Sequence, residues 1–114
     1  LAALGALQAD THYLQTHLNE IKNSRALCLQ ALNDSGVLRQ RVQSEGAFYI
    51  FARIQSRLSD LETAHHLIRE NGVATIPGSA FATEGYLRIS YGALTSDNVD
   101  IGMQRLIKGL QQLA

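Results

Sequence analysis

The stretch Tyr86-Leu-Arg-Ile-Ser-Tyr-Gly92 decides how the rest of the chain can be arranged. Its side chains alternate in character, and alternation is typical of a β-strand with one buried face. The apolar face would carry Leu87, Ile89 and Tyr91. The opposite face would carry an aromatic ring, a guanidinium and a hydroxyl, from Tyr86, Arg88 and Ser90. By residue type alone, Arg88 is either a surface cation or a clamp for an anionic ligand.

A long helix is predicted before this strand. Asp10 or Thr11 can cap its start, and Gly36 lies just past its end. Its apolar stripe is formed by Leu14, Leu18, Ile21, Cys28 and Leu32. Arg25 interrupts that stripe. Its stem can follow the apolar surface with the guanidinium at the rim, or the residue can have a functional role.

Two further helices carry clear start signals. Ser59-Asp-Leu-Glu62 is a capping box, and the helix it opens is expected to run to Asn71 and end at Gly72. Its predicted buried stripe is Leu61, Ala64, Leu67 and Ile68. Thr95-Ser-Asp97 opens a closing helix with an acidic first turn. The apolar stripe of that helix is Val99, Met103, Leu106, Ile107, Leu110 and Leu113.

The remaining segments read as strands and turns. Ala47–Ile54 is aromatic and β-branched on both faces, which favours an interior strand covered on both sides. Gly46, just before it, permits a close backbone approach or an unusual φ. Val73–Ile76 is expected to be a short apolar strand that Pro77-Gly78 breaks, followed by a brief extended piece at Ser79–Phe81.

The order of elements predicts an α+β (α/β two-layer) domain, in which helices pack on one or both faces of a small mixed or antiparallel sheet. A length of 114 residues suits one domain. Ten basic residues balance ten acidic ones, so there is no electrostatic footprint for nucleic acid or an anionic membrane. No apolar run is long enough to span a bilayer.

The inventory of reactive side chains is sparse. Cys28 is the only cysteine, which fits a reducing compartment, and its place on an apolar stripe predicts a buried, inert thiol. His12 and His17 are five residues apart, while His65 and His66 diverge around their helix, so we predict no metal site. The two lysines, Lys22 and Lys108, lie among polar neighbours at mid-helix. No phosphate-binding loop or catalytic triad is present.

Four blocks in register resemble one family: Glu45-Gly-Ala-Phe-Tyr49, Leu67-Ile-Arg-Glu-Asn-Gly-Val73, Ile76-Pro-Gly-Ser-Ala-Phe81 and Tyr86-Leu-Arg-Ile-Ser90. They are similar to the C-terminal small domain of fold-type-I, pyridoxal-phosphate-dependent aminotransferases of the aspartate aminotransferase group (class I/II). The similarity covers essentially the whole chain. Two departures concern the subfamily and local loop shape: Ser44 stands where the family usually has proline, and Ala82 where it usually has glycine.

The resemblance implies a role for two residues. Arg88 matches the family's arginine that binds the α-carboxylate of the amino-acid substrate, a role that a planar guanidinium suits. Gly46 matches a position where the small domain closes over the substrate. Its alternative reading is a simple strand-entry glycine. No catalytic residue is expected within residues 1–114.

The resemblance also implies what lies outside the chain. Because the sequence begins abruptly and without Met, we expect residues 1–114 to be a small-domain fragment, with 1–9 a truncated helix leading in from a missing large domain. Pyridoxal 5'-phosphate and its Schiff-base lysine would belong to that domain, so the fragment alone would bind no cofactor and be inactive. The parent would be a cytoplasmic homodimer that transfers an amino group between an amino acid and a 2-oxo acid. It would have no nucleic-acid or membrane partner.

Two alternatives for the parent stay open. The same kind of domain serves other fold-type-I enzymes, including those of the C–S lyase type, because Arg88 would read only the carboxylate that all amino acids share. A transcription regulator with an aminotransferase-like domain is the second alternative. The sequence does not specify which amino acid would be the substrate.

Overall fold

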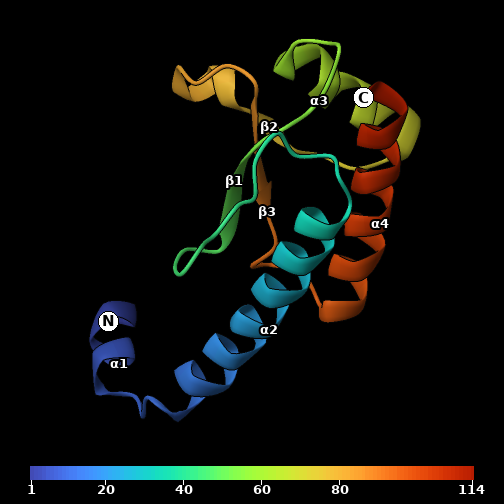
Figure 1. Ribbon diagram of the computed structural model, residues 1–114. Helices are drawn as coiled ribbons and strands as arrows, with labels where there is room; N and C mark the ends of the chain where they lie inside the picture. The colour runs from blue at the N-terminus through green and yellow to red at the C-terminus, as the bar shows by residue number, and fades with distance from the viewer.

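Three antiparallel strands form the centre of the chain, in the order β1-β3-β2 (Figure 1). The computed structural model describes residues 1–114. Its elements are α1 (Ala2–Gln8), α2 (His12–Asp34), β1 (Tyr49–Arg53), α3 (Asp60–Asn71), β2 (Ile76–Pro77), the 3-10 helix η1 (Gly78–Phe81), β3 (Tyr86–Ser90) and α4 (Ser96–Leu113). The predicted α+β class is confirmed, and the sheet is purely antiparallel.

The strand that contains Arg88 is the central one. β3 pairs with β1 on one side and with β2 on the other. Its predicted core face is confirmed, since Leu87, Ile89 and Tyr91 are all at most 6% exposed. Leu87 and Ile89 face the helices, so Arg88 between them faces the other way.

The prediction that Ala47–Ile54 is an interior strand is wrong. β1 is an edge strand, whose other side makes only a single bridge, between Leu38 and Ile54. Alternate residues Ile50, Ala52 and Ile54 enter the core. Its aromatic residues are only half-buried, because they lie on the open face and pack on other side chains of that face. Phe51, for example, stacks on Tyr86 with the ring centroids 4.9 Å apart.

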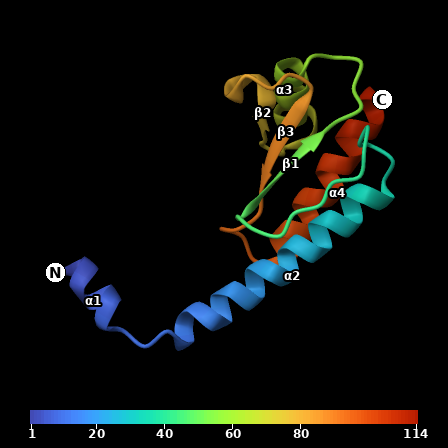
Figure 2. The same ribbon diagram turned by 60° about the vertical axis from the view of Figure 1, so that its left-hand side comes forward.

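All three long helices lie on one side of the sheet (Figure 2). The core between the two layers takes Cys28 and Leu32 from α2, Ala64 and Leu67 from α3, and Val99, Met103, Leu106 and Leu110 from α4. The predicted stripe of α4 is confirmed, with only Ile107 partly exposed. Gly109 lets α4 approach α3 closely, because a Cβ there would overlap the Leu67 and Asn71 side chains.

The predicted helix ends are confirmed at three places. The Ser59 side chain accepts from the Glu62 N–H and the Glu62 carboxylate accepts from the Ser59 N–H, which completes the capping box of α3. Gly72 ends that helix in the left-handed conformation, with φ of 65°. Thr95 caps α4 by accepting from the Asn98 N–H.

The predicted stripe of α3 is partly wrong. Leu61 and Ile68 are about half-exposed, at 49% and 50%. The buried face instead contains Asp60 and Thr63 with Ala64 and Leu67. Polar side chains can occupy this face because each finds a hydrogen-bond partner there. The Thr63 hydroxyl pairs with the Ser56 hydroxyl at 2.9 Å.

The segment after α3 also differs from its prediction. Only Ile76 of Val73–Ile76 enters a strand, Pro77 is the last residue of β2 rather than its breaker, and Ser79–Phe81 is 3-10 helical rather than extended. Two contacts made by this segment explain its shape. The Asp60 carboxylate accepts from the Ser79 N–H at 2.7 Å, and Gly78 packs so tightly against Thr83 O and Tyr86 that a Cβ would clash.

The N-terminal part of the chain extends away from the two layers (Figures 1 and 2). α1 buries no residue, and it is separated from α2 by a short break at residues 9–11. Leu14 and Leu18 of the predicted α2 stripe are 42% and 47% exposed, so only the later turns of α2 reach the core. No helix has the length and apolar character that crossing a membrane requires.

Candidate functional site

Arg88 stands in the middle of the open face of the sheet. Directly opposite it across the two ladders are Phe51 of β1 and Ile76 of β2. Side chains of directly paired residues point to the same face of a sheet, so these neighbours flank Arg88 on the side that no helix covers. Arg88 is half-buried there, whereas most other arginines of the chain are exposed.

Aromatic rings surround the guanidinium. The Arg88 Cζ lies 4.3 Å from the centroid of the Tyr49 ring and 5.7 Å from that of the Phe81 ring. Both distances are within the range of a cation–π interaction. Phe51 meets Phe81 edge-on, with centroids 6.1 Å apart. Together these four side chains line a shallow depression of about 270 Å3. We call it the Arg88 depression.

No acidic side chain of the chain neutralises Arg88. The one ion pair in the structure joins His17 to Glu20 and lies on α2. The Arg88 Nε is buried and has no hydrogen-bond partner. Removing a cation from water without pairing it is unfavourable, and an anion from outside the chain would supply the missing partner. A carboxylate suits the guanidinium best, because its two oxygens match two parallel N–H donors.

Gly46 lies three residues before Tyr49 and is exposed to solvent. A Cβ at this position would meet nothing within 4 Å. Gly46 has neither the close backbone approach nor the positive φ that a glycine permits, and the positive φ, of 60°, belongs to Ala47. Among the residues of this chain, Gly46 is an exposed glycine that precedes β1 and has open space around it.

Tyr91 holds the segment around Gly46 against the end of β3. Its hydroxyl donates to the Ala47 carbonyl at 3.1 Å, and its backbone N–H donates to Phe48 O at 3.0 Å. Burial raises the pKa of Tyr91, an effect that the nearby Arg25 charge opposes. The hydroxyl therefore keeps its proton and stays a donor at neutral pH.

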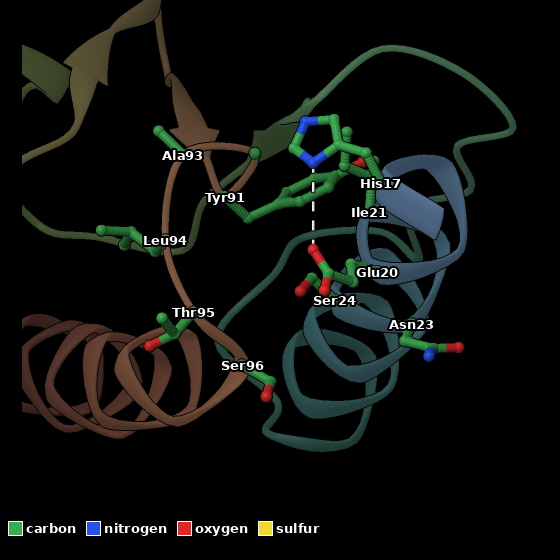
Figure 3. A pocket seen from close by; sticks show the side chains of 11 residues that line it. His17, Glu20, Ile21, Asn23, Ser24, Tyr91, Ala93, Leu94, Thr95 and Ser96 are labelled. Carbon is green, nitrogen blue, oxygen red and sulfur yellow. Dashed lines mark ion pairs between the residues drawn. The ribbon is translucent and has the colours of Figure 1, made fainter. Parts of the chain in front are cut away.

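A larger hollow, of about 410 Å3, lies between α2 and the loop from Tyr91 to Ser96 (Figure 3). His17 and Glu20 face each other across part of its wall, with their nearest N and O atoms 3.8 Å apart. Both side chains are well exposed, at 61% and 73%, and such surface pairs contribute at most about 1 kcal/mol. Arg88 does not line this hollow, so we take the smaller Arg88 depression as the candidate site.

The other reactive groups stay apart. No group of three or more His, Cys, Asp or Glu side chains gathers in a way that could hold a metal ion. Cys28 is fully buried, and burial raises its pKa to about 11. A thiol with this pKa carries almost no thiolate at neutral pH, in agreement with the predicted inert cysteine.

Arg88 was a candidate from the sequence, but the rings around it were not. Tyr49 and Phe81 were parts of the quoted blocks, with no role of their own. Tyr49 could have been found only from the strand register, which pairs Tyr49 with Ser90 and so places its ring beside Arg88. Phe81 depends on the fold of η1, which carries its ring to the open face.

Comparison with known proteins identifies the family. The family described as aminotransferase class I and II matches residues 1–106. The aromatic-amino-acid aminotransferase 2 of Thermococcus litoralis is 41% identical over 96 residues, which are 82% of this chain and 24% of that protein. An aspartate aminotransferase of Thermotoga maritima is 37% identical over 90 residues, which are 79% of this chain and 22% of that protein.

A solved structure shows the same fold. The aromatic aminotransferase from Pyrococcus horikoshii OT3 superimposes with a TM-score of 0.84 at 32% identity, covering 97% of this chain and 30% of that one. The chain thus spans about a quarter of the length of the curated relatives it matches. The four sequence blocks, the helix-covered sheet and these likenesses agree, and the chain belongs to the aminotransferase class I and II family.

Proposed function

We propose that this chain is the substrate-clamping C-terminal domain of a pyridoxal-phosphate-dependent aminotransferase, in which Arg88 binds the α-carboxylate of the substrate. The parent enzyme transfers an amino group between an amino acid and a 2-oxo acid. The observation that supports this proposal most is the half-buried Arg88 guanidinium, which has no anionic partner and stands on the open face of the sheet.

The work of Arg88 is to position the substrate. Two parallel hydrogen bonds from the guanidinium to the carboxylate fix the orientation of the substrate, which a single ammonium group cannot do. Held in this way, the Cα–H of the amino acid is presented in one orientation to the reacting groups. Gly46, by family likeness, lies where the domain closes over the substrate, and the open space around it leaves room for a neighbouring surface.

The residues of this chain do not suit pyridoxal phosphate itself. A Schiff-base lysine needs a desolvated amine, but both Lys22 on α2 and Lys108 on α4 are exposed. Neither lysine lines the Arg88 depression. The cofactor, which supplies the electron sink for the reaction, is assigned to the large domain that would account for most of the remaining length of the relatives. We expect the 114 residues alone neither to hold the cofactor nor to transaminate.

The decisive variant is Arg88→Lys in the full-length polypeptide, with a large domain preceding these residues. L-Aspartate and L-phenylalanine are suitable probes, since the relatives are named for aspartate and aromatic substrates. Losing the two-pronged contact removes about 1.5–3 kcal/mol, or roughly 10- to 150-fold in apparent affinity. The cofactor absorbance band should be unchanged, because Arg88 makes no contact with the cofactor in this proposal.

Arg53→Lys is the matched control. Arg53 lies on the open face of the same sheet, opposite Tyr86, but it is exposed. Its substitution should leave substrate affinity unchanged. An Arg88→Lys enzyme that binds both amino acids as well as the unaltered enzyme would refute the proposed role. Measuring the 2-oxo acid formed with and without an amino-group acceptor separates transamination from lyase chemistry.

A further inference from the structure

The Arg88 guanidinium has no polar contact within the chain to hold it in place. It makes no hydrogen bond or ion pair, and its Nε is buried without a partner. Arginine has a long side chain with several rotatable bonds, so an unanchored guanidinium would sample many positions. The only specific interactions at its head are with two aromatic rings, those of Tyr49 and Phe81.

We propose that Tyr49 is a positioning residue for the carboxylate clamp, whose ring holds the face of the Arg88 guanidinium so that the edge stays free for a substrate carboxylate. This inference rests on the proposed role of Arg88. The Tyr49 ring lies closer to the guanidinium than the Phe81 ring, with centroid distances of 4.3 Å against 5.7 Å. Cation–π attraction falls with distance, so Tyr49 contributes the larger share.

The geometry of a guanidinium explains why a ring suits this task. All its N–H donors point outward in the plane of the group. An aromatic ring over the face therefore orients the cation without consuming the donors that a carboxylate needs. An acidic side chain in the place of Tyr49 would hold Arg88 equally well, but it would occupy the same donors and compete with the substrate.

Tyr49 is itself well placed to be a rigid support. It is the first residue of β1 and pairs with Ser90, two residues from Arg88 on the central strand. The Phe48 ring meets the Tyr49 ring edge-on, with centroids 5.8 Å apart. Phe81, by contrast, is exposed by 49% and belongs to the short helix η1. The ring on the strand is therefore the better fixed of the two.

The test separates the ring from the hydroxyl and from general packing. In the full-length polypeptide, Tyr49→Leu should weaken L-aspartate and L-phenylalanine binding by about 2- to 30-fold, the range of a cation–π contact. Apparent KM should rise more than kcat falls, and cofactor absorbance should not change. Tyr49→Phe keeps the ring and should restore near-normal KM. Tyr86→Leu is the matched control, because Tyr86 is a tyrosine on the same open face that stacks on Phe51 and does not line the Arg88 depression.

Two further readouts keep the outcomes distinct. In an Arg88→Gln background, Tyr49→Leu should raise KM by less than about 2-fold, because the cation that Tyr49 orients is no longer present. In nuclear magnetic resonance spectra of the 114-residue chain, the Arg88 Nε–H signal should shift more in Tyr49→Leu than in Tyr86→Leu.

Equal effects of Tyr49→Leu and Tyr86→Leu on KM, or an undiminished effect of Tyr49→Leu in the Arg88→Gln background, would overturn the inference while leaving Arg88 as the clamp. If Arg88→Lys itself leaves amino-acid affinity unchanged, the proposed function fails first.

Discussion

Asp60 is the residue whose loss should most disturb the support of the Arg88 depression. Only 5% of the residue is exposed. One oxygen accepts from the Ser79 N–H at 2.7 Å and the other from the Leu61 N–H at 2.8 Å. The first bond connects the start of α3 to η1, which carries Phe81. Asp60→Ala therefore removes the link between a stable helix and a wall of the site.

The loss in free energy of unfolding caused by Asp60→Ala follows from these contacts. A hydrogen bond to a charged group contributes about 1.5–3 kcal/mol. The Leu61 N–H lies in the first helical turn and can hydrogen-bond to water after the substitution, so we take its bond at the low end of this range. The favourable interaction of the Asp60 carboxylate with the helix dipole is also taken at the low end of its range. We expect Asp60→Ala to lower the free energy of unfolding by about 3–5 kcal/mol, or roughly 4 °C in Tm per kcal/mol for a domain of this size.

Two measurements check this expectation. Urea unfolding of the 114-residue chain gives the change in free energy, and amide hydrogen exchange gives the loss of protection at Ser79. Asp97→Asn is the matched control, since Asp97 is an exposed acid in the first turn of α4 and should cost only about 0.3–1 kcal/mol. If Asp60→Ala costs no more than Asp97→Asn, or if Ser79 exchanges at the same rate in both, the reasoning is refuted.

Three other outcomes follow from local geometry and ionisation. Ala82 has a left-handed conformation with φ of 57°, so Ala82→Gly should raise the free energy of unfolding by about 0.5–1 kcal/mol in urea unfolding, whereas Ala80→Gly in η1 should lower it. The pKa of Cys28 is raised from 9.0 to about 11, so the folded state loses stability as pH rises from about 9 to 11. Cys28→Ala should remove that pH dependence, and an unchanged slope would contradict the assignment. Hydrogen bonds from the Ser59 hydroxyl and N–H lower the pKa of Glu62, so its stabilising effect is present above the ordinary carboxyl value of 4.5 and is lost as pH falls through the lower folded value. In unfolding curves recorded between neutral and acidic pH, the free energy of unfolding of Glu62→Gln should fall less at acidic pH than that of the unaltered chain.

Features that depend on neighbouring residues were predictable. The capping box at Ser59, the left-handed Gly72 and the Thr95 cap were all confirmed, because a cap is satisfied by donors and acceptors within one turn. The core face of β3 was confirmed for the same reason, since alternation along a strand needs no knowledge of its partners. The family could be recognised from the four blocks.

Features that depend on distant partners were not predictable. The aromatic residues of β1 suggested two covered faces, but the long helices all lie on one side of the sheet and leave the other face open. η1 was expected to be extended because nothing local shows that Asp60, 19 residues earlier, accepts from Ser79. The buried face of α3 was predicted wrongly for the same reason, because the hydrogen bond to Ser79 places the polar Asp60 on that face. Each error concerns a contact that forms only when separate elements meet.

The sequence by itself determined that this chain is an α+β domain of the aminotransferase class I and II family with Arg88 on the solvent side of a strand, since periodicity, caps and motif spacing are local properties. Only the tertiary structure decided that the strand of Arg88 is central, that its guanidinium lacks any acidic partner, and that Tyr49 lies 4.3 Å from it. Strand pairing brings together residues that are 39 positions apart, and that register is set by packing the whole sheet against its helices rather than by either segment alone.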